Sequence, residues 1–277
     1  MTPIRSRDNP RVKRWKKLAC DASFRRMEKK LFVEGPHLVA EALGAGIEPL
    51  AVLVSESGLR RAEIRQLVGK REPVVLADRV FNAVTDADTP AGIAAEVALP
   101  RGPVDPAKPA AFLEGIQDPS NVGAILRSAA AFGLGEVVLD RACADPWSPR
   151  SLRAGQGGHF KLAVRQVTDL PTAFEAFSGT LVCTVLREGI PLRGAALEQR
   201  LGWILGAEGR GVSEAIARHA ALRVTIPMAP GSESLNVAAA AAICFYEAFA
   251  RISTPGGGSA APAGSSSRSP RSTWSSN

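Results

Sequence analysis

Five polar residues in the C-terminal half of the chain have side chains that could act together on a bound molecule. They are Asn121, Arg127, Glu208, Ser234 and Asn236. The set offers amide and hydroxyl groups that donate and accept hydrogen bonds, one carboxylate, and one guanidinium that is always positively charged. Such a set can orient a polar substrate and stabilise negative charge that develops on it.

These residues lie in three short segments, each of which follows a predicted strand and opens a predicted helix. The segments are Asn-Val-Gly-Ala-Ile-Leu-Arg at 121–127, Leu-Gly-Ala-Glu-Gly-Arg-Gly at 205–211, and Ile-Pro-Met followed by Ser-Leu-Asn-Val within 226–237. In an open α/β sheet the ligand binds beyond the carboxyl ends of the strands. The three segments therefore predict one shared cleft.

The glycines and serines of these segments do not match the common nucleotide-binding or hydrolase motifs. The glycines around Glu208 follow the order Gly-x-x-Gly-x-Gly, which differs from the Gly-x-Gly-x-x-Gly of the dinucleotide fold. The chain has no Gly-x-x-x-x-Gly-Lys-Ser/Thr phosphate loop, and no Gly-x-Ser-x-Gly elbow surrounds Ser232 or Ser234. A nucleotide-dependent oxidoreductase and a serine hydrolase are therefore weak alternatives.

Gly123 and Arg127 are four residues apart, so they share one face of a predicted helix that begins after Ser120 and ends at Gly133. The missing side chain of Gly123 leaves a gap beneath the guanidinium, which could admit a substrate or a phosphate. Alternatively, Gly123 serves close helix packing and Arg127 joins a surface ion pair. The residues by themselves favour neither interpretation.

Apolar runs in the C-terminal module predict strands that are buried on both faces, as in a parallel sheet. The predicted strands are 111–116, 136–139, 161–164, 181–186, 203–206 and 222–226. Ser148-Pro149 is typical of a helix start, and a long alanine-rich helix is expected from Ser234 to about Ile252. This alternation of strands and helices predicts the α/β fold class.

Prolines divide the chain into two modules. They occur at every third position from Pro100 to Pro109, and because proline removes backbone donors, residues 100–110 are expected to form an extended linker. The linker separates an N-terminal module, 1–99, from a C-terminal module, 111–253. Short predicted strands and helices alternate in the N-terminal module, which fits a small α/β sandwich. Residues 254–277 are rich in Gly, Ser, Pro and Ala and are expected to be disordered.

Positive charge is concentrated at the N-terminus. The chain has a net charge of +7, and residues 1–30 contain eleven Lys and Arg against three acidic residues, a net charge of +8. Neutralising a phosphate backbone releases counterions, so nucleic acid is the leading partner. A solvated helix face, an acidic protein or an anionic lipid surface are the alternatives. The residues expected to bind nucleic acid are Arg11, Lys13, Arg14, Lys16 and Lys17.

The cysteines and histidines form no metal-binding pattern. Cys20, Cys143, Cys183 and Cys244 are far apart, and none lies at a metal-ligand spacing from a histidine. We therefore expect buried free thiols and no metal. No apolar stretch reaches the roughly 18 residues that would cross a bilayer, so we expect a soluble, cytoplasmic protein that does not enter a membrane.

Taken together, the three segments resemble the motifs of the SpoU (TrmH-like) family of the SPOUT RNA methyltransferases. Asn-x-Gly-x-x-x-Arg at 121–127, Leu-Gly-x-Glu-x-x-Gly at 205–211, and Ile-Pro-Met followed by Ser-Leu-Asn-Val at 226–237 occur in the family's order and at workable separations. Residues 9–13 and 32–35 also look like the substrate-binding domain common in this family, which is similar to ribosomal-protein-type RNA binders. The likeness covers most of the chain.

The resemblance implies a fold, a cofactor and an activity. The C-terminal module would be a SPOUT-type α/β trefoil-knot domain with a parallel sheet, in a homodimer, preceded by a small α/β RNA-binding domain. It would transfer a methyl group from S-adenosylmethionine to a ribose 2′-hydroxyl of structured RNA, either rRNA of the 23S type or tRNA. Gly206, Ile226 and Leu235 would contact the cofactor, largely through backbone groups. The five polar residues named first would line the reaction site.

Arg127 is often cast in this family as the group that activates the hydroxyl. Because an arginine stays protonated, it is a poor general base, and we expect Arg127 to orient the ribose and stabilise charge on the 2′-oxygen. Glu208 and Asn121 would hold its fork in place. The alternative function is a non-catalytic RNA-binding protein that retains the fold, but the intact Arg127, Glu208 and Asn236 argue against it. The run 153–159 departs from the family pattern and leaves the RNA target open.

Overall fold

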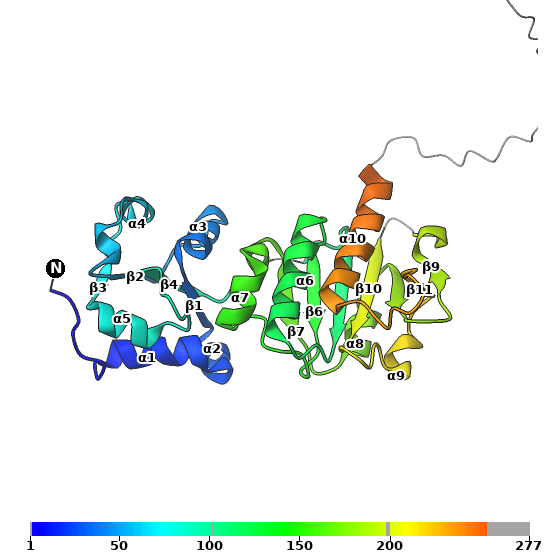
Figure 1. The fold of residues 1–277 in the computed structure, drawn as a ribbon, viewed down its shortest axis with the longest axis horizontal. Helices are drawn as coiled ribbons and strands as arrows, with labels where there is room; N and C mark the ends of the chain where they lie inside the picture. The colour runs from blue at the N-terminus through cyan, green and yellow to red at the C-terminus, as the bar shows by residue number, and fades with distance from the viewer. Residues whose placement is uncertain (1, 101, 103, 198–199, 254–277) are drawn as a thin grey trace, which may run out of the picture.

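The computed structural model describes residues 2–100, 102, 104–197 and 200–253. Two sheets lie side by side along the longest axis, with the N-terminal sheet at the left of Figure 1. One strand ends at Ala98 and the next begins at Ala110. The linker predicted at 100–110 includes two residues outside the described ones, and it stays a prediction. The tail predicted to be disordered, 254–277, lies outside the described residues.

The N-terminal sheet has four strands in the order β1-β4-β2-β3. They are β1 (Lys30–Glu34), β2 (Ala51–Ser55), β3 (Val74–Leu76) and β4 (Ile93–Ala98). β4 is antiparallel to both of its neighbours, whereas β2 and β3 are parallel.

Helices cover both faces of this sheet, as expected for a small sandwich. The helices are α1 (Pro10–Cys20), α2 (Ala22–Glu28), α3 (Pro36–Gly44), η1 (Gly58–Arg60, a 3₁₀ turn), α4 (Ala62–Val68) and α5 (Asp78–Val84). Leu31 and Val33 pack with α3 and α4 on one face, and Phe32 packs with α1 and α5 on the other. Since successive side chains of a strand point to opposite faces, three consecutive residues of β1 serve two cores.

The sequence analysis missed β4, the strand that joins β1 to β2. Its residues, Ile-Ala-Ala-Glu-Val-Ala, contain few strong strand formers, and only its neighbours define it as a strand. Glu96 of β4 is buried and accepts hydrogen bonds from the Trp15 indole at 2.8 Å and from the Arg14 guanidinium at 2.7 and 2.8 Å. Burial alone would raise the pKa of Glu96, but these bonds outweigh it and hold that pKa below its usual range.

The C-terminal sheet has seven strands in the order β7-β6-β5-β10-β8-β11-β9, and its described strand pairs are parallel. The strands are β5 (Ala110–Glu114), β6 (Glu136–Leu139), β7 (Ala163–Gln166), β8 (Thr180–Thr184), β9 (Ile190–Pro191), β10 (Leu201–Gly206) and β11 (Leu222–Thr225). The predicted α/β class with a parallel sheet is therefore confirmed. The trefoil knot that the resemblance implies stays a prediction.

Helices also cover both faces of the C-terminal sheet. They are α6 (Pro119–Ala131), α7 (Pro149–Gly155), η2 (Gly158–Lys161, a 3₁₀ turn), α8 (Leu170–Glu175), η3 (Leu192–Gly194, a 3₁₀ turn), α9 (Glu214–Ala217) and α10 (Val237–Ser253). α6 and α10 pack with Leu113 and Trp203 on one face, and α8 and α9 pack with Phe112 and Ile204 on the other. Among the described helices, none is long and apolar enough to span a lipid bilayer.

Several predicted boundaries shift in the structure. The strand expected at 161–164 begins at Ala163, because residues 158–161 form the 3₁₀ turn η2. The strand expected at 181–186 ends at Thr184, and the last helix begins at Val237 instead of Ser234. Both of these changes leave irregular backbone at the carboxyl edge of the sheet, where the cleft was predicted.

Candidate functional site

The three predicted segments meet beside the carboxyl end of β10. Asn121, in the first turn of α6, donates from Nδ2 to Oε1 of Glu208, in the loop after β10, across 2.6 Å. Asn236, just before α10, donates from Nδ2 to Oδ1 of Asn121 across 2.9 Å. One chain of hydrogen bonds therefore joins residues that are far apart in the sequence, since Asn121 lies 87 positions from Glu208 and 115 positions from Asn236.

The orientation of both amides follows from the cap of α10. Oδ1 of Asn236 accepts hydrogen bonds from the backbone N–H groups of Ala238 at 2.9 Å and Ala239 at 3.2 Å, so it caps the helix. With this oxygen occupied, the nitrogen of Asn236 must face Asn121, whose oxygen accepts and whose nitrogen then donates to the Glu208 carboxylate. The cap also explains why α10 begins at Val237.

A cavity of about 640 Å³ opens beside this chain of hydrogen bonds. It is lined by residues 184–186 at the end of β8, by the loop 206–212 after β10, and by residues between the end of β11 and the start of α10. Its volume lies in the range typical of cofactor and small-molecule sites.

Six of the eight predicted cofactor and reaction-site residues line this cavity. The six are Gly206, Ile226, Leu235, Glu208, Ser234 and Asn236. Asn121 reaches the site through its hydrogen bonds to two of them, and Arg127 lies outside the lining. The structure thus gathers seven of these eight residues, while the role of each residue stays a prediction.

The sequence analysis missed the part of the cavity that comes from β8. Thr184, Val185 and Leu186 line it because β8 lies between β10 and β11 in the parallel sheet, so its carboxyl end opens on the same side. The sequence does show a strand followed by a polar loop at this place. It does not show the order of the strands in the sheet, and that order decides which loops lie together at the cavity.

Gly206 is required by the loop that follows it. A Cβ at this position would lie 2.1 Å from the carbonyl carbon of Gly211 and 2.2 Å from the nitrogen of Val212. The loop folds back on itself, and the N–H of Gly211 donates to the carbonyl of Ala207 at 2.8 Å. The close approach expected from a ligand is therefore made by the loop's own backbone, and this compact loop presents Glu208 to Asn121.

Arg127 is exposed on α6, and its side chain makes no hydrogen bond or ion pair within the described part of the chain. The expectation that Asn121 and Glu208 hold its guanidinium is not met, because those two side chains bond to each other. The reason is helical geometry. Six residues separate Asn121 from Arg127, so at 3.6 residues per turn their side chains leave α6 about a third of a turn apart.

The two interpretations of Gly123 are resolved in favour of helix packing. A Cβ on Gly123 would lie 2.2 Å from the Ser151 carbonyl oxygen and 2.9 Å from the Gly155 nitrogen, so the glycine lets α6 and α7 touch through their backbones. The expected gap beneath Arg127 is therefore filled by the protein. The surface ion pair suggested for Arg127 is not formed among the described residues.

Three cysteines and one histidine of this domain are buried. Desolvation raises the pKa of Cys183 to about 11 and that of Cys244 to about 12, so both stay neutral thiols. Cys143 is also buried, whereas Cys20 is exposed, against expectation. Burial lowers the pKa of His159 to about 4, and its Nε2 donates to the Pro146 carbonyl at 2.8 Å. The described residues contain no group of three or more potential metal ligands.

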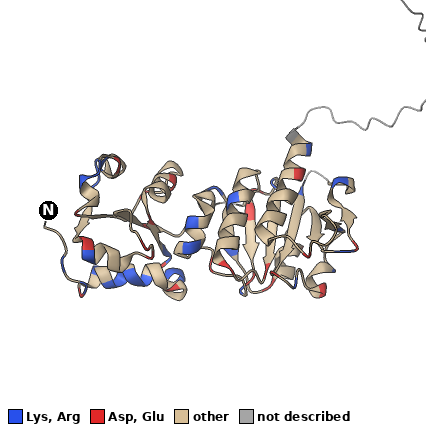
Figure 2. Ribbon diagram, in the orientation of Figure 1, with Lys and Arg blue, Asp and Glu red and all other residues tan. Residues whose placement is uncertain are grey.

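All five residues predicted to bind RNA lie on α1, where Figure 2 shows a concentration of Lys and Arg. Arg11, Lys13, Lys16 and Lys17 are exposed. Arg14 is different, because its guanidinium turns inward to Glu96 and so supports the core of the N-terminal domain. RNA contact by all five stays a prediction, and the internal bonds of Arg14 make it the weakest member of the set.

Two family models match the chain. The SpoU rRNA Methylase family matches residues 109–246, which contain the three segments and the cavity. The MRM3-like substrate binding domain matches residues 9–95, which contain α1 and the four-stranded sheet up to the last residues of β4.

Individual relatives agree with these models. The 23S rRNA (guanosine(2553)-2'-O)-methyltransferase RlmP of Bacillus subtilis is 33% identical over 248 residues, which cover 89% of this chain and 98% of that protein. The crystal structure of an RNA 2'-O ribose methyltransferase has a TM-score of 0.77 at 28% identity, covering 91% of this chain and 99% of that one. The SpoU methyltransferase AviRb from Streptomyces viridochromogenes, solved with AdoMet, has a TM-score of 0.79 at 26% identity. The match covers 88% of this chain and 99% of that one.

Fold, site and relatives define the class as S-adenosylmethionine-dependent RNA ribose 2′-O-methyltransferases, which confirms the predicted enzyme class and cofactor. The chain belongs to the SpoU rRNA methylase family. The alternative, a non-catalytic RNA-binding protein with the same fold, is not favoured.

Substituting Asn236 separates its two roles. Asn236→Asp keeps an oxygen to cap α10 but sets an acceptor against Oδ1 of Asn121, so we expect near-wild-type thermal stability and a roughly 10- to 100-fold loss of methyl transfer. Asn236→Ala loses the cap as well, which costs about 1 kcal/mol of stability. Thermal unfolding and transfer of tritiated methyl to RNA measure the two effects. The exposed Asn82→Asp is the control, and full activity of Asn236→Asp would refute the role of the hydrogen-bond chain.

Proposed function

We propose that this chain methylates a ribose 2′-hydroxyl of ribosomal RNA of the 23S type, with tRNA as the second candidate substrate. The observation that carries the proposal is the convergence of Asn121, Glu208 and Asn236 beside a cavity of cofactor size. The printed substrate of the Bacillus subtilis relative supports 23S rRNA, because that relative is matched over nearly its whole length. Such a substrate favours a cytoplasmic location, which cell fractionation would test.

The residues around the cavity suit S-adenosylmethionine. Leu186, Ile226 and Leu235 offer apolar surface to a purine, while the backbone groups of the loop 206–212 and the hydroxyl of Ser234 offer polar partners. When bound, the cofactor supplies an electrophilic methyl group on a positively charged sulfur. The proposed transfer needs no metal ion, so we propose that none takes part.

We propose that Arg127 acts on the substrate and not on the cofactor. Its guanidinium is exposed and has no partner among the described residues, so all five of its donors are free for a ribose oxygen or a neighbouring phosphate. Positive charge held beside the 2′-oxygen favours the partly deprotonated form that attacks the methyl group. The hydrogen-bond chain of Asn121, Glu208 and Asn236, about a third of a turn away on α6, would keep the cofactor loops in place.

Replacing Arg127 tests both the enzyme and its proposed substrate. Wild type should transfer tritiated methyl to 23S rRNA. Arg127→Lys should lose much of the rate, because lysine keeps the charge but lacks the planar guanidinium that donates two parallel hydrogen bonds. Arg127→Ala should lose nearly all of the rate. Calorimetry should give unchanged S-adenosylmethionine affinity for both variants. Arg223→Ala, which breaks an exposed pair with Glu214 in the same domain, is the control. Wild-type transfer by Arg127→Ala would remove Arg127 from the site, and label in tRNA alone would favour the second substrate.

We propose that the exposed cations of α1 bind the RNA backbone. Deleting residues 1–30 would not test this, because Val12, Trp15 and Leu18 belong to the core of the N-terminal domain. Lys13→Gln combined with Lys17→Gln should instead weaken RNA binding and reduce the slope of log affinity against log salt by roughly 0.7–0.9 per lost phosphate contact. Cofactor affinity should not change. Lys70→Gln, on an exposed turn, is the control, and an unchanged slope in the double variant would refute the proposal.

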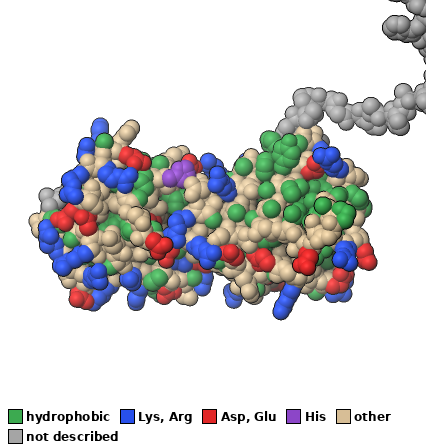
Figure 3. Space-filling view, viewed as in Figure 1, with side chains coloured by type: hydrophobic (Ala, Val, Ile, Leu, Met, Phe, Trp, Pro, Cys, Tyr) green, Lys and Arg blue, Asp and Glu red, His purple; other side chains and the backbone are tan. Residues whose placement is uncertain are grey.

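We also propose that the chain forms a homodimer through α10. This helix exposes the large apolar side chains of Ile243, Tyr246, Phe249 and Ile252, and apolar side chains gather over it in Figure 3. Phe132, just after α6, lies against Tyr246 and Phe249 and continues this surface. A patch of this kind is typical of an interface. Sedimentation equilibrium should give a dimer for wild type and a monomer for Tyr246→Glu, and a monomeric wild type would contradict the proposal.

A further inference from the structure

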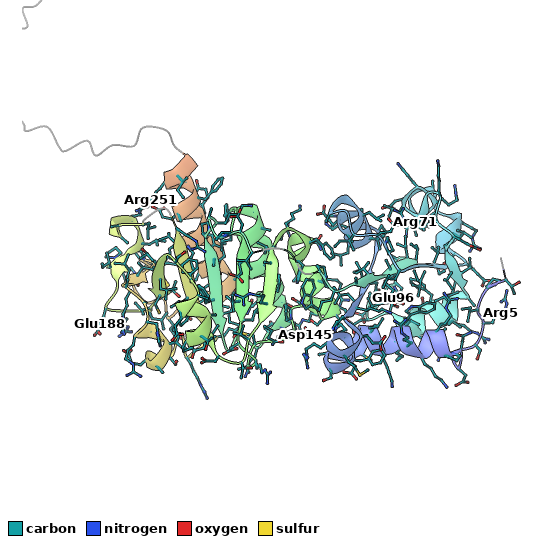
Figure 4. The ribbon with its side chains drawn as sticks, turned by 180° about the vertical axis from the view of Figure 1, so that it is seen from behind. Arg5, Arg71, Glu96, Asp145, Glu188 and Arg251 are labelled. Atoms are coloured by element: carbon teal, nitrogen blue, oxygen red, sulfur yellow. The ribbon has the colours of Figure 1, made fainter. Side chains whose placement is uncertain are left out.

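A buried arginine joins the N-terminal domain to the C-terminal domain. Nε and Nη2 of Arg25, in α2, donate to Oδ2 of Asp145, in the loop after β6, at 3.2 and 2.6 Å. The Arg25 side chain is only 5% exposed and that of Asp145 17%. Figure 4 shows Asp145 at the junction between the two domains. Because both charges are shielded from water, removing one partner would leave the other buried and unpaired.

The same guanidinium also holds the end of α1. Its Nη1 donates to the carbonyl oxygens of Leu18 at 2.7 Å and Ala19 at 3.0 Å, both in the last turn of the helix. Carbonyl groups in that turn lack partners within the helix, and a cation there is favoured. Arg25 therefore bonds at once to the basic helix α1 and to the C-terminal domain.

Asp145 is fixed in turn by the chain around it. Its Oδ1 accepts a hydrogen bond from the N–H of Trp147 at 3.0 Å. Trp147, just before α7, and Leu152, within α7, are buried in the same core as Leu31 and Val33 of β1. Side chains of the C-terminal domain thus complete the core of the N-terminal domain, so the junction is packed and not an open hinge.

Among the described residues, two other ion pairs cross the junction at its surface. Arg153 pairs with Asp86 at 2.7 Å, and these side chains are 38% and 50% exposed. Lys161 pairs with Glu41 at 3.1 Å, with 62% and 28% exposed. Exposed pairs of this kind contribute little to stability, whereas a buried pair is costly to break. Arg25 and Asp145 are therefore the pair on which the relative position of the domains most depends.

The contact continues from the junction to the helix that carries Arg127. α7, which places Leu152 in the core of the N-terminal domain, packs against α6 with no side chain between Gly123 and the Ser151 carbonyl. A Cβ at Gly158, in η2, would lie 2.9 Å from the Cα of Arg127. Interiors packed this closely do not absorb displacement, so Arg127 is fixed relative to the C-terminal side of the junction. Loosening of the junction itself would therefore change the position of α1 relative to Arg127.

We propose that Arg25 is a positioning residue, whose bond to Asp145 holds the basic helix α1 at a fixed distance from Arg127. The inference rests on the proposed function, because it requires that α1 binds RNA and that Arg127 acts on the ribose. RNA held by α1 would then bring one particular nucleotide to the cavity. A loosened junction would let neighbouring riboses reach it, so the methylated position would become less uniform.

Asp145→Asn is the most informative variant, since it removes the ion pair but keeps the size of the side chain and an oxygen for Trp147. We expect an increase of about tenfold or more in the KM for RNA with a smaller change in kcat, and methyl groups at nucleotides adjacent to the normal one. S-adenosylmethionine affinity, measured by calorimetry, should stay within about twofold of wild type because the cavity does not include these residues. Arg25→Lys, which keeps the charge, should behave between Asp145→Asn and wild type.

Glu48→Gln is the matched control, since it breaks an exposed arginine pair, Arg71 with Glu48, within the N-terminal domain. It should leave the KM, the kcat and the methylated nucleotide unchanged. A purely structural role of Arg25 predicts a lower unfolding temperature for Asp145→Asn with an unchanged KM and unchanged product. That result in the folded variant would overturn the proposal. If Asp145→Asn does not fold, the KM for RNA and the methylated nucleotide of Arg25→Lys decide the question in the same way.

Hydrogen exchange on the full chain separates failure of this inference from failure of the proposed function. Faster exchange at the backbone of α1 and of Trp147 in Asp145→Asn would show that the pair holds the junction, whatever the substrate. Unchanged exchange at both places would overturn the proposed role of Arg25 even if wild type methylates RNA. If wild type transfers no methyl group to rRNA or tRNA, the proposed function fails, and the positioning role fails with it even though the exchange data would still define the junction.

Discussion

The arrangement of the site depends on the cap that Asn236 forms on α10. Its oxygen receives two backbone N–H groups of the helix, and this leaves its nitrogen only one direction, toward Asn121 and so toward Glu208. A helix terminus, a loop and the first turn of another helix are thereby held in one orientation. The cavity opens where these three pieces of backbone meet, so a bond that satisfies a helix end also shapes the site.

Arg127 stands apart from this chain of bonds, and the separation has a chemical meaning. Glu208 and Asn236, which line the cavity, are joined through Asn121, whereas the guanidinium of Arg127 projects from α6 without a partner among the described residues. Fixed groups suit a cofactor that is always the same molecule. A free cation suits a substrate that arrives from solution and carries its own negative charge.

The two domains share a hydrophobic core and a buried ion pair. Trp147 and Leu152 belong to the core of the N-terminal domain, and the Arg25–Asp145 pair closes the junction from the other side. The glycine contact of α6 with α7 then links that junction to the helix of the reaction site. This continuity fixes the N-terminal domain, which we propose binds RNA, against the C-terminal domain.

The sequence by itself determined the α/β class, most strands of the parallel sheet and the order of the three segments. These follow from runs of contiguous residues, whose periodicity and spacing are visible without a structure. The cavity residues Gly206, Ile226 and Leu235 came from the resemblance of those segments to the motifs of a known family. Only the tertiary structure decided that Asn121 bonds to Glu208 and not to Arg127. Partners so distant in sequence are chosen by strand order and by the direction in which each helix faces, and neither is encoded in a local pattern. The same reason explains why β4 escaped prediction, since only its pairing on both edges defines it as a strand.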